Sequence, residues 1–361
     1  MTRYRFDQIA ENSTAKKKPE EGDRNRYVGL EHLDPGTLEV TRWGAEVTPK
    51  GDKLLMKKGD VLFGRRRAYQ KKVGIAPFDG IFSAHGMVLR PKTVVIDSSF
   101  FPFFISSDAF LNEAIRVSVG SLSPTANWKD LRTLEFNLPS LGKQRELAGI
   151  LSKAEQLKGH YRNLLAACDD VIKSQFVEMF GSANEGNLKP LKDVCSIITD
   201  GTHQPPKFKD DGVPFLFVSN IVSDAIDYET NKFISTEDYE QLIRRTPIEK
   251  DDILVSAVGS FGHPAIVKDT RPFCFQRHIA YLKPRRDLID SNYLHAALLS
   301  ENAQRYMDRC AKGAAQRTVT LKSFKEMRVP VPSLPLQREF ADFAAQVDKS
   351  KFKLGTCGGM L

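Results

Sequence analysis

The densest group of chemically capable side chains in the sequence lies between two glycines, Gly64 and Gly74, where cations surround an aromatic ring. Arginine can clamp a phosphate or contact the edge of guanine with two hydrogen bonds, and a tyrosine can pack on a sugar or a base. The segment therefore favours nucleic-acid binding over catalysis, with a solvated charged hairpin as the alternative. Its candidate residues are Arg65, Arg66, Arg67, Tyr69, Gln70, Lys71 and Lys72.

The chain contains this region twice, with different side chains in the two copies. Residues 82–158 and 275–351 align without a gap at an offset of 193 (278 − 85 = 193 for His85 and His278). Upstream the offset is 192, which places residues 256–263 opposite the arginine-rich segment. A repeat of this length is a duplicated domain, because solenoid repeats span only about 20 to 50 residues. The second copy has Ser260 and His263 here, so two DNA-binding modules would read different sequences.

Other polar loops supply less concentrated candidates for contact with bases or phosphates. A charge run is often only a solvated face, so the lysines among them have a structural alternative. We expect His85 and His278 to hold their own loops, and Thr125 and Thr318, which are in register, to cap a helix or a turn. The remaining candidates for DNA contact are Lys16, Lys17, Lys18, Ser123, His203, Gln204, Lys207, Arg277, Gln316 and Arg317.

The sequence lacks the motifs of a catalytic centre. It has no phosphate-binding loop, no dinucleotide-binding turn and no nucleophile elbow. The seven histidines show no zinc-ligand spacing, and the Asn-Pro-Pro-aromatic or Asp-Pro-Pro-aromatic motif of an amino-methyltransferase is missing. Acidic residues that cannot be paired from sequence, such as Asp210, Asp211 and Asp227, leave a cryptic DNA-modifying enzyme open as an alternative.

Length, composition and charge fit two globular domains. The 361 residues suit two domains of roughly 100 to 200 residues, and a net charge of +8 favours a polyanionic partner. The five cysteines are scattered without a C-x-x-C pair, as in reduced cytosolic proteins. No stretch approaches the 18 or so consecutive apolar residues of a membrane span, and the first residues lack a signal-peptide core. We expect a cytoplasmic protein.

A long helix is predicted between the two copies, because residues 142–181 contain no proline and apolar residues return every three and four positions. The same phase recurs after the second copy. Such a seam can pack on the other helix or on a partner, and an ordinary helical core is the alternative. After Phe352 we expect the helix to fray, since each glycine costs about 1 kcal/mol relative to alanine. The seam residues are Leu147, Ile150, Leu157, Tyr161, Leu164, Val171, Phe340, Phe343 and Val347.

Each copy is expected to mix strands and helices. Apolar runs predict strands near residues 60–63 and 86–90, with equivalents at 252–255 and 279–283. One helix is expected over residues 99–119 and one over 292–312, before a last strand at 133–138 or 326–331. The predicted fold is α/β (α+β-like), with two duplicated mixed-sheet domains separated by long coiled-coil-forming helices. The predicted boundaries are 1–141 and 183–334 for the domains, and 142–182 and 335–361 for the helices.

Two repeated signatures carry a resemblance to a known family over nearly the whole chain. They are N-L-P-S-L-G-K-Q-R-E at 137–146 with P-V-P-S-L-P-L-Q-R-E at 330–339, and K-G-D-V-L at 58–62 with K-D-D-I-L at 250–254. In the order module, long helix, module, helix, the chain resembles the DNA specificity subunits of type I restriction–modification systems.

The resemblance implies a non-catalytic subunit with two target-recognition domains, each binding one half of a split double-stranded DNA site. Its helices would set the spacing between the halves and dock methyltransferase subunits, and restriction translocase–nuclease subunits would join the assembly. S-adenosylmethionine, ATP and magnesium are then expected on those partners and no cofactor on this chain. The family pattern has a distal helix as long as the central one, whereas this chain reaches only the position equivalent to Cys168 (361 − 193 = 168). A protein-only scaffold is the remaining alternative.

Overall fold

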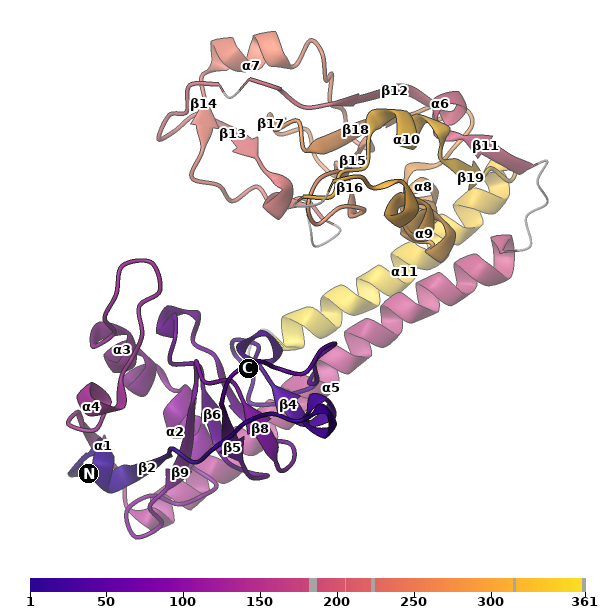
Figure 1. Cartoon of the computed structure of the whole chain (residues 1–361). Coiled ribbons are helices and arrows are strands. Elements are labelled where there is room, and N and C mark those ends of the chain that lie inside the picture. The colour runs from indigo at the N-terminus through magenta and orange to yellow at the C-terminus, as the bar shows by residue number, and fades with distance from the viewer. Residues whose placement is uncertain (182–186, 205, 222–224, 314–315, 359–361) are drawn as a thin grey trace. The chain divides into compact units, whose positions relative to one another are not determined.

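The computed structural model describes residues 1–181, 187–204, 206–221, 225–313 and 316–358, without the side chains of residues 352–358. The chain forms two compact units, Met1–His160 and Tyr161–Leu361 (Figure 1). The boundary falls inside one long helix, α5 (Leu141–Phe180), so each unit contains one module and part of this helix.

Three sheets and several short helices make up the first module. Strands β2, β9, β6 and β7 form an antiparallel sheet in that order, and β3, β5, β8 and β4 form a mixed sheet in which β4 and β8 are parallel. Strand β1 pairs with β10 and so joins the first residues of the module to its last strand. The bounds are β1 (Thr2–Arg5), α1 (Phe6–Ile9), β2 (Ala10–Ser13), β3 (Lys16–Lys17), η1 (Glu21–Arg26), β4 (Tyr27–Val28), η2 (Leu30–His32), β5 (Lys53–Met56), β6 (Val61–Phe63), η3 (Ala68–Gln70), β7 (Val73–Ile75), β8 (Gly80–Phe82), β9 (Met87–Pro91), α2 (Phe101–Ser106), α3 (Asp108–Arg116), α4 (Trp128–Leu131) and β10 (Glu135–Leu138).

Strand β6 is buried on both faces, which explains why its sequence is apolar without alternation. Val61 and Phe63 pack in a core with Phe101 and Phe110 from helices α2 and α3. Leu62, which points to the opposite face, packs in a second core with residues of β4, β5 and β8. The module is therefore held by two apolar layers on either side of its central strands.

The second module repeats this arrangement. Strands β12, β18, β15 and β16 form an antiparallel sheet, β14, β13 and β17 form a mixed sheet with β13 parallel to β17, and β11 pairs with β19. The bounds are β11 (Leu188–Pro190), α6 (Leu191–Val194), β12 (Cys195–Asp200), β13 (Val213–Leu216), η5 (Val218–Asn220), β14 (Phe233–Ile234), α7 (Thr236–Leu242), β15 (Ile253–Ser256), β16 (Pro264–Ile266), β17 (Cys274–Phe275), β18 (Ile279–Pro284), α8 (Ser291–Leu299), α9 (Glu301–Cys310), α10 (Leu321–Glu326), β19 (Arg328–Pro330) and α11 (Leu334–Gly358).

The equivalence extends to single side chains. Ile253 and Val255 of β15 face one core and Leu254 faces the other, as their counterparts at an offset of 192 do in β6. The predicted α/β fold with duplicated mixed-sheet modules is therefore confirmed.

The single helix predicted after the central strands is wrong in both modules, because a serine divides it. Ser107 has extended backbone angles (φ −73°, ψ 151°), and its side chain accepts a hydrogen bond from the backbone NH of Phe110. Ser300, at the equivalent position (107 + 193 = 300), caps α9 by accepting from the backbone NH of Ala303. An N-cap serine of this kind ends one helix and begins the next.

Helix α5 and helix α11 both begin after a Pro-Ser dipeptide. Within the second unit, the last part of α5 runs antiparallel to α11 (Figure 1): Phe176 packs on Phe340 with ring centroids 5.5 Å apart, and Asp169 forms an ion pair with Lys351. Helix α11 continues to Gly358, beyond Phe352, where we expected fraying to begin. Glycine weakens a helix by about 1 kcal/mol without preventing the helical conformation. Residues 359–361 lie outside the described part of the chain.

A buried glutamine fastens each long helix to its module. The side-chain oxygen of Gln144 accepts from the backbone NH of Asp97 (2.8 Å), and its NH2 group donates to the carbonyls of Val95 (3.2 Å) and Pro139 (2.9 Å). Gln337 makes the same three bonds to the residues at an offset of 193, namely Asp290, Leu288 and Pro332. Both glutamines are fully buried. The repeated Q-R-E signature thus encodes a clamp between helix and module.

Candidate nucleic-acid interface

Three loops that the sequence singled out separately meet in the first module. We call them loop A (residues 64–74), loop B (83–85) and loop C (121–127). Thr125 of loop C forms a β-bridge with Arg66 of loop A, and the backbone NH of Arg67 donates to the carbonyl of Pro124 (2.6 Å). The NH of Arg66 donates to the carbonyl of His85 in loop B (3.1 Å). The loops therefore form one continuous surface.

The second module joins its loops A (256–263), B (276–278) and C (314–320) in the same way, although residues 314 and 315 lie outside the described part. Thr318 bridges Val258, as Thr125 bridges Arg66, and the NH of Gly259 donates to the carbonyl of Arg317 (2.9 Å). The NH of Ala257 donates to the carbonyl of His278 in loop B (2.8 Å).

The two threonines were expected to cap a helix or a turn. Thr125 does stabilise a turn by donating from Oγ1 to the carbonyl of Ser123 (3.0 Å). Its backbone, like that of Thr318, additionally joins loop A to loop C.

The arginines of loop A carry uncompensated charge. The guanidinium groups of Arg66 and Arg67 each reach the hydroxyl of Ser123 (3.5 and 3.4 Å), and that of Arg65 reaches the side-chain oxygen of Asn127 (3.4 Å). Within the described residues, none of the three forms an ion pair with a carboxylate. Burial lowers the pKa of His85, and the nearby cations, Arg66 foremost, lower it further. The positive potential at this surface suits a polyanion.

Loop A also contains strained backbone and an exposed ring. Arg67 (φ 55°) and Lys71 (φ 51°) have left-handed angles on either side of the turn η3, which lifts Tyr69 into solvent with 53% of its surface exposed. Gln70 is half-buried in the same turn. A left-handed conformation costs free energy for residues other than glycine, and such positions cluster at functional sites.

The structure gives several of the candidate lysines contacts inside the module. Lys71 forms an ion pair with Asp108 (2.6 Å), and Lys72 donates to the backbone carbonyl of Leu30 (2.7 Å). Lys17 binds Asp23 (3.0 Å), a hydrogen bond that raises the pKa of the lysine. Lys16 and Lys18, on either side of Lys17, are exposed.

Loops A and C of the second module have less free charge. Arg317 forms an ion pair with Asp308 (2.7 Å), and its guanidinium carbon lies 5.3 Å from the ring centre of Phe261. Ser260 contacts the imidazole of His263 (3.2 Å), and Gln316 is exposed.

A fourth segment, residues 199–204, extends the surface of the second module. The backbone of Thr202 pairs with loop B, because the NH of Arg277 donates to its carbonyl (3.0 Å). Asp200 binds the imidazole of His203 (2.9 Å) and the guanidinium of Arg245 (2.6 Å). These three residues line a hollow of about 220 Å³. No sequence signal identified Arg245, which follows helix α7 and reaches Asp200 only through the fold. Gln204 and Lys207 are exposed.

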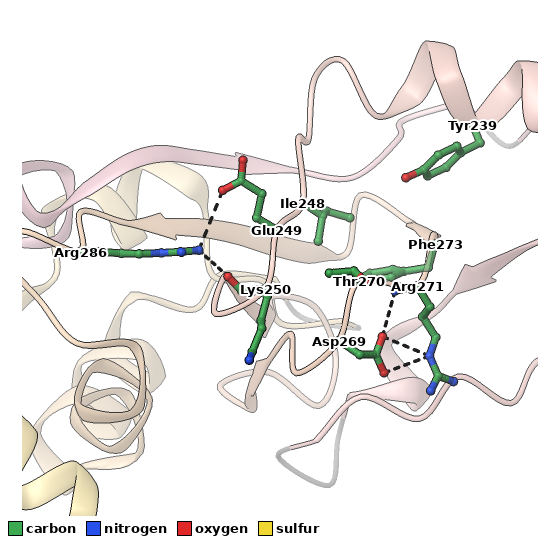
Figure 2. Close-up of a pocket in the computed structure, with 9 residues that line it drawn as sticks. All are labelled: Tyr239, Ile248, Glu249, Lys250, Asp269, Thr270, Arg271, Phe273 and Arg286. Atoms are coloured by element: carbon green, nitrogen blue, oxygen red, sulfur yellow. Dashed lines mark hydrogen bonds and ion pairs between the residues drawn. The ribbon is translucent and has the colours of Figure 1, made fainter.

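A second hollow, of about 280 Å³, lies on the same module, and Figure 2 shows that its charged side chains pair with one another. Arg271 binds Asp269 (3.0 Å), and Arg286 lies 3.9 Å from Glu249. Its opposite charges are therefore compensated internally, which does not favour an anion. Within the described residues, no group of three or more His, Cys, Asp or Glu side chains could hold a metal ion.

The predicted helix seam divides into a covered and an uncovered half. Phe340 is fully buried, and Leu147, Tyr161, Phe343 and Val347 are partly covered. The other four predicted seam residues recur every seven positions along α5, and each keeps 41 to 59% of its surface exposed: Ile150, Leu157, Leu164 and Val171. We call these four the open stripe.

Comparison with known proteins identifies the family. The family model described as "Type I restriction modification DNA specificity domain" matches residues 5–164 and again residues 185–356. The chain therefore belongs to this family and carries its domain twice. No helix in the described part of the chain is long and apolar enough to cross a membrane.

Individual relatives are similar over different lengths. The chain is 31% identical over 139 residues to the type I restriction enzyme EcoBI specificity subunit of Escherichia coli, a match that covers 38% of this chain and 29% of that subunit. It is 21% identical over 291 residues to the MjaVIII specificity subunit of Methanocaldococcus jannaschii, covering 74% and 68%. The solved S subunit from M. genitalium superposes with a TM-score of 0.47 at 16% identity, covering 99% of this chain and 92% of the other.

Proposed function

We propose that this chain is the DNA specificity subunit of a type I restriction–modification system, and that each module contacts one half of a split DNA site. The observation that carries the proposal is the three-loop surface, which equivalent backbone contacts build in both modules with different side chains on it. Base contacts specify a sequence, while cations supply phosphate affinity that weakens with salt. Two surfaces of one design with different side chains suit two different half-sites.

The open stripe supports a docking role for the helices. An apolar residue every seventh position on an exposed helix face is typical of a seam that a partner helix covers. Within the second unit, α11 packs on other residues of α5, such as Phe176 and Phe180, and leaves Leu164 and Val171 exposed. We infer that methyltransferase subunits cover the open stripe.

In this proposal the chain has no catalytic activity of its own. S-adenosylmethionine binds to the methyltransferase subunits, and ATP and magnesium bind to translocase–nuclease subunits. Helix α5, with 40 residues, is about 60 Å long at 1.5 Å per residue and acts as the spacer between the two half-sites.

The test is to co-express the chain with the methyltransferase encoded beside it and to map methylated adenines in the host DNA by single-molecule sequencing. A split motif with two defined halves and a fixed gap is the expected result. A stable complex without methylation would instead favour a protein-only scaffold, and methylation by the purified chain alone would favour a hidden enzyme.

A further inference from the structure

We propose that the two modules hold DNA by different means, with the first as a charged anchor and the second as a nearly uncharged reader. The inference rests on the proposed function, because it assigns unequal roles to the two three-loop surfaces. It concerns residues of this chain and not the arrangement of the modules relative to each other.

The comparison is direct because the same backbone carries both surfaces. At the offset of 192, Arg65, Arg66 and Arg67 of the first module correspond to Ala257, Val258 and Gly259 of the second. The NH groups of Arg67 and Gly259 donate to equivalent carbonyls of loop C at 2.6 and 2.9 Å. The hydrogen bonds that loop C returns to the carbonyls of Arg65 and Ala257 are also equivalent, at 3.0 and 2.8 Å. Three cations are thus replaced by three apolar or small residues on one scaffold.

The remaining charges do not restore the balance. Arg317 of the second module is neutralised by Asp308 at 2.7 Å and packs on Phe261. In the described parts of loops A to C of that module, Arg277 is the one exposed cation without a carboxylate partner. The first module has three such arginines, although Arg65 is half-buried. Their hydrogen bonds to Ser123 and Asn127 are long and neutral, so phosphate oxygens can compete for them.

The backbone of loop A gives an independent indication. Arg67 (φ 55°) has the left-handed conformation that Gly259 (φ 75°) has at the equivalent position. Glycine adopts this conformation without the steric cost that a side chain incurs. The first module therefore keeps a cation where the shared backbone favours glycine, which is expected if the cation has a role outside folding.

Counterion release turns this difference into a measurable quantity. The logarithm of the DNA affinity falls with the logarithm of salt concentration by about 0.9 for each phosphate that a cation neutralises. Removal of the three arginines should reduce this slope by about 2 to 2.7, whereas removal of Arg277 should reduce it by at most about 0.9.

The experiment uses the full chain co-purified with its methyltransferase and a fluorescent 40-base-pair duplex of mixed sequence, titrated between 50 and 200 mM salt. The anchor variant is R65A/R66A/R67G, and the matched control is R277A. A third variant, R65K/R66K/R67K, keeps the charge and should keep the slope, which separates loss of charge from damage to the fold. Thermal unfolding of each complex verifies that the modules remain folded.

The expected result is a slope reduced by at least about 2 in the anchor variant, by at most about 0.9 in R277A, and unchanged in the lysine variant. Equal reductions in the anchor variant and R277A would overturn the inference, as would an unchanged slope in the anchor variant. These outcomes leave the proposed function standing, since the wild-type complex still binds DNA. A wild-type complex that does not bind the duplex at any salt concentration would refute the proposed function itself.

Discussion

Replacement of Gln144 by alanine should destabilise the first module and leave the second unaffected. The glutamine is fully buried and makes three hydrogen bonds, at 2.8, 2.9 and 3.2 Å. Alanine leaves one backbone NH and two carbonyls without partners in a site closed to solvent. At about 1 kcal/mol for each lost bond, the expected loss is about 3 kcal/mol in the free energy of unfolding.

The chain provides a specific probe for this effect. Both of its tryptophans, Trp43 and Trp128, belong to the first unit, and Trp128 packs on Phe6 with ring centres 5.5 Å apart. Tryptophan fluorescence during urea denaturation therefore reports on this module alone. With a urea dependence of about 2 kcal/mol per molar, a loss of 3 kcal/mol lowers the midpoint by about 1.5 M.

The matched control is the same substitution at Gln337, which makes the equivalent bonds in the second module. Q337A should leave the fluorescence midpoint unchanged while it lowers the unfolding transition of the second module, detected by circular dichroism. A fluorescence shift in Q144A below about 0.3 M, or an equal shift in Q337A, would refute the argument that each glutamine clamps its own module.

Two further predictions concern charged groups. D60N should cost about 2 kcal/mol, because Asp60 binds Arg90 through two hydrogen bonds of 2.8 Å, whereas D252N should change stability by less than about 1 kcal/mol, because burial raises the pKa of the Asp252 carboxyl and disfavours its charge; urea denaturation of the two variants compares them, and equal losses would contradict this reasoning. The lowered pKa of His85 means that the folded state favours its neutral form, so its contribution to stability is complete above the ordinary pKa of 6.5 and declines as the pH falls below that value. R66A should raise the pKa of His85, which an NMR titration measures, and an unchanged pKa would show that the guanidinium does not act on the ring.

The sequence predicted the elements of the fold better than their interruptions. Apolar runs without alternation located β6 and β15 because both faces of these strands are buried. The divisions at Ser107 and Ser300 were missed because serine also occurs inside helices, and its capping role depends on backbone angles that the sequence does not state.

The candidate site was predictable as separate loops and not as a surface. The residue types of loop A indicated nucleic-acid contact, but its union with loops B and C depends on backbone hydrogen bonds between segments about 20 and 60 residues apart. The compensation of Lys71 by Asp108 and the contribution of Arg245 likewise arise from tertiary contacts. Gln144 and Gln337 were detectable in principle, because identical amides in register at the start of two helices indicate a shared buried role.

The most direct test of the central claim is to map methylated adenines for variants of each three-loop surface in the assembled complex. R66A/S123A alters the surface of the first module, and S260A/Q316A alters that of the second. A lost base contact relaxes discrimination by about 1 to 3 kcal/mol, so each pair should broaden the motif in one half and leave the other half unchanged. A motif that changes in both halves with either pair, or in neither half with both pairs, would contradict the assignment of one three-loop surface to each half-site.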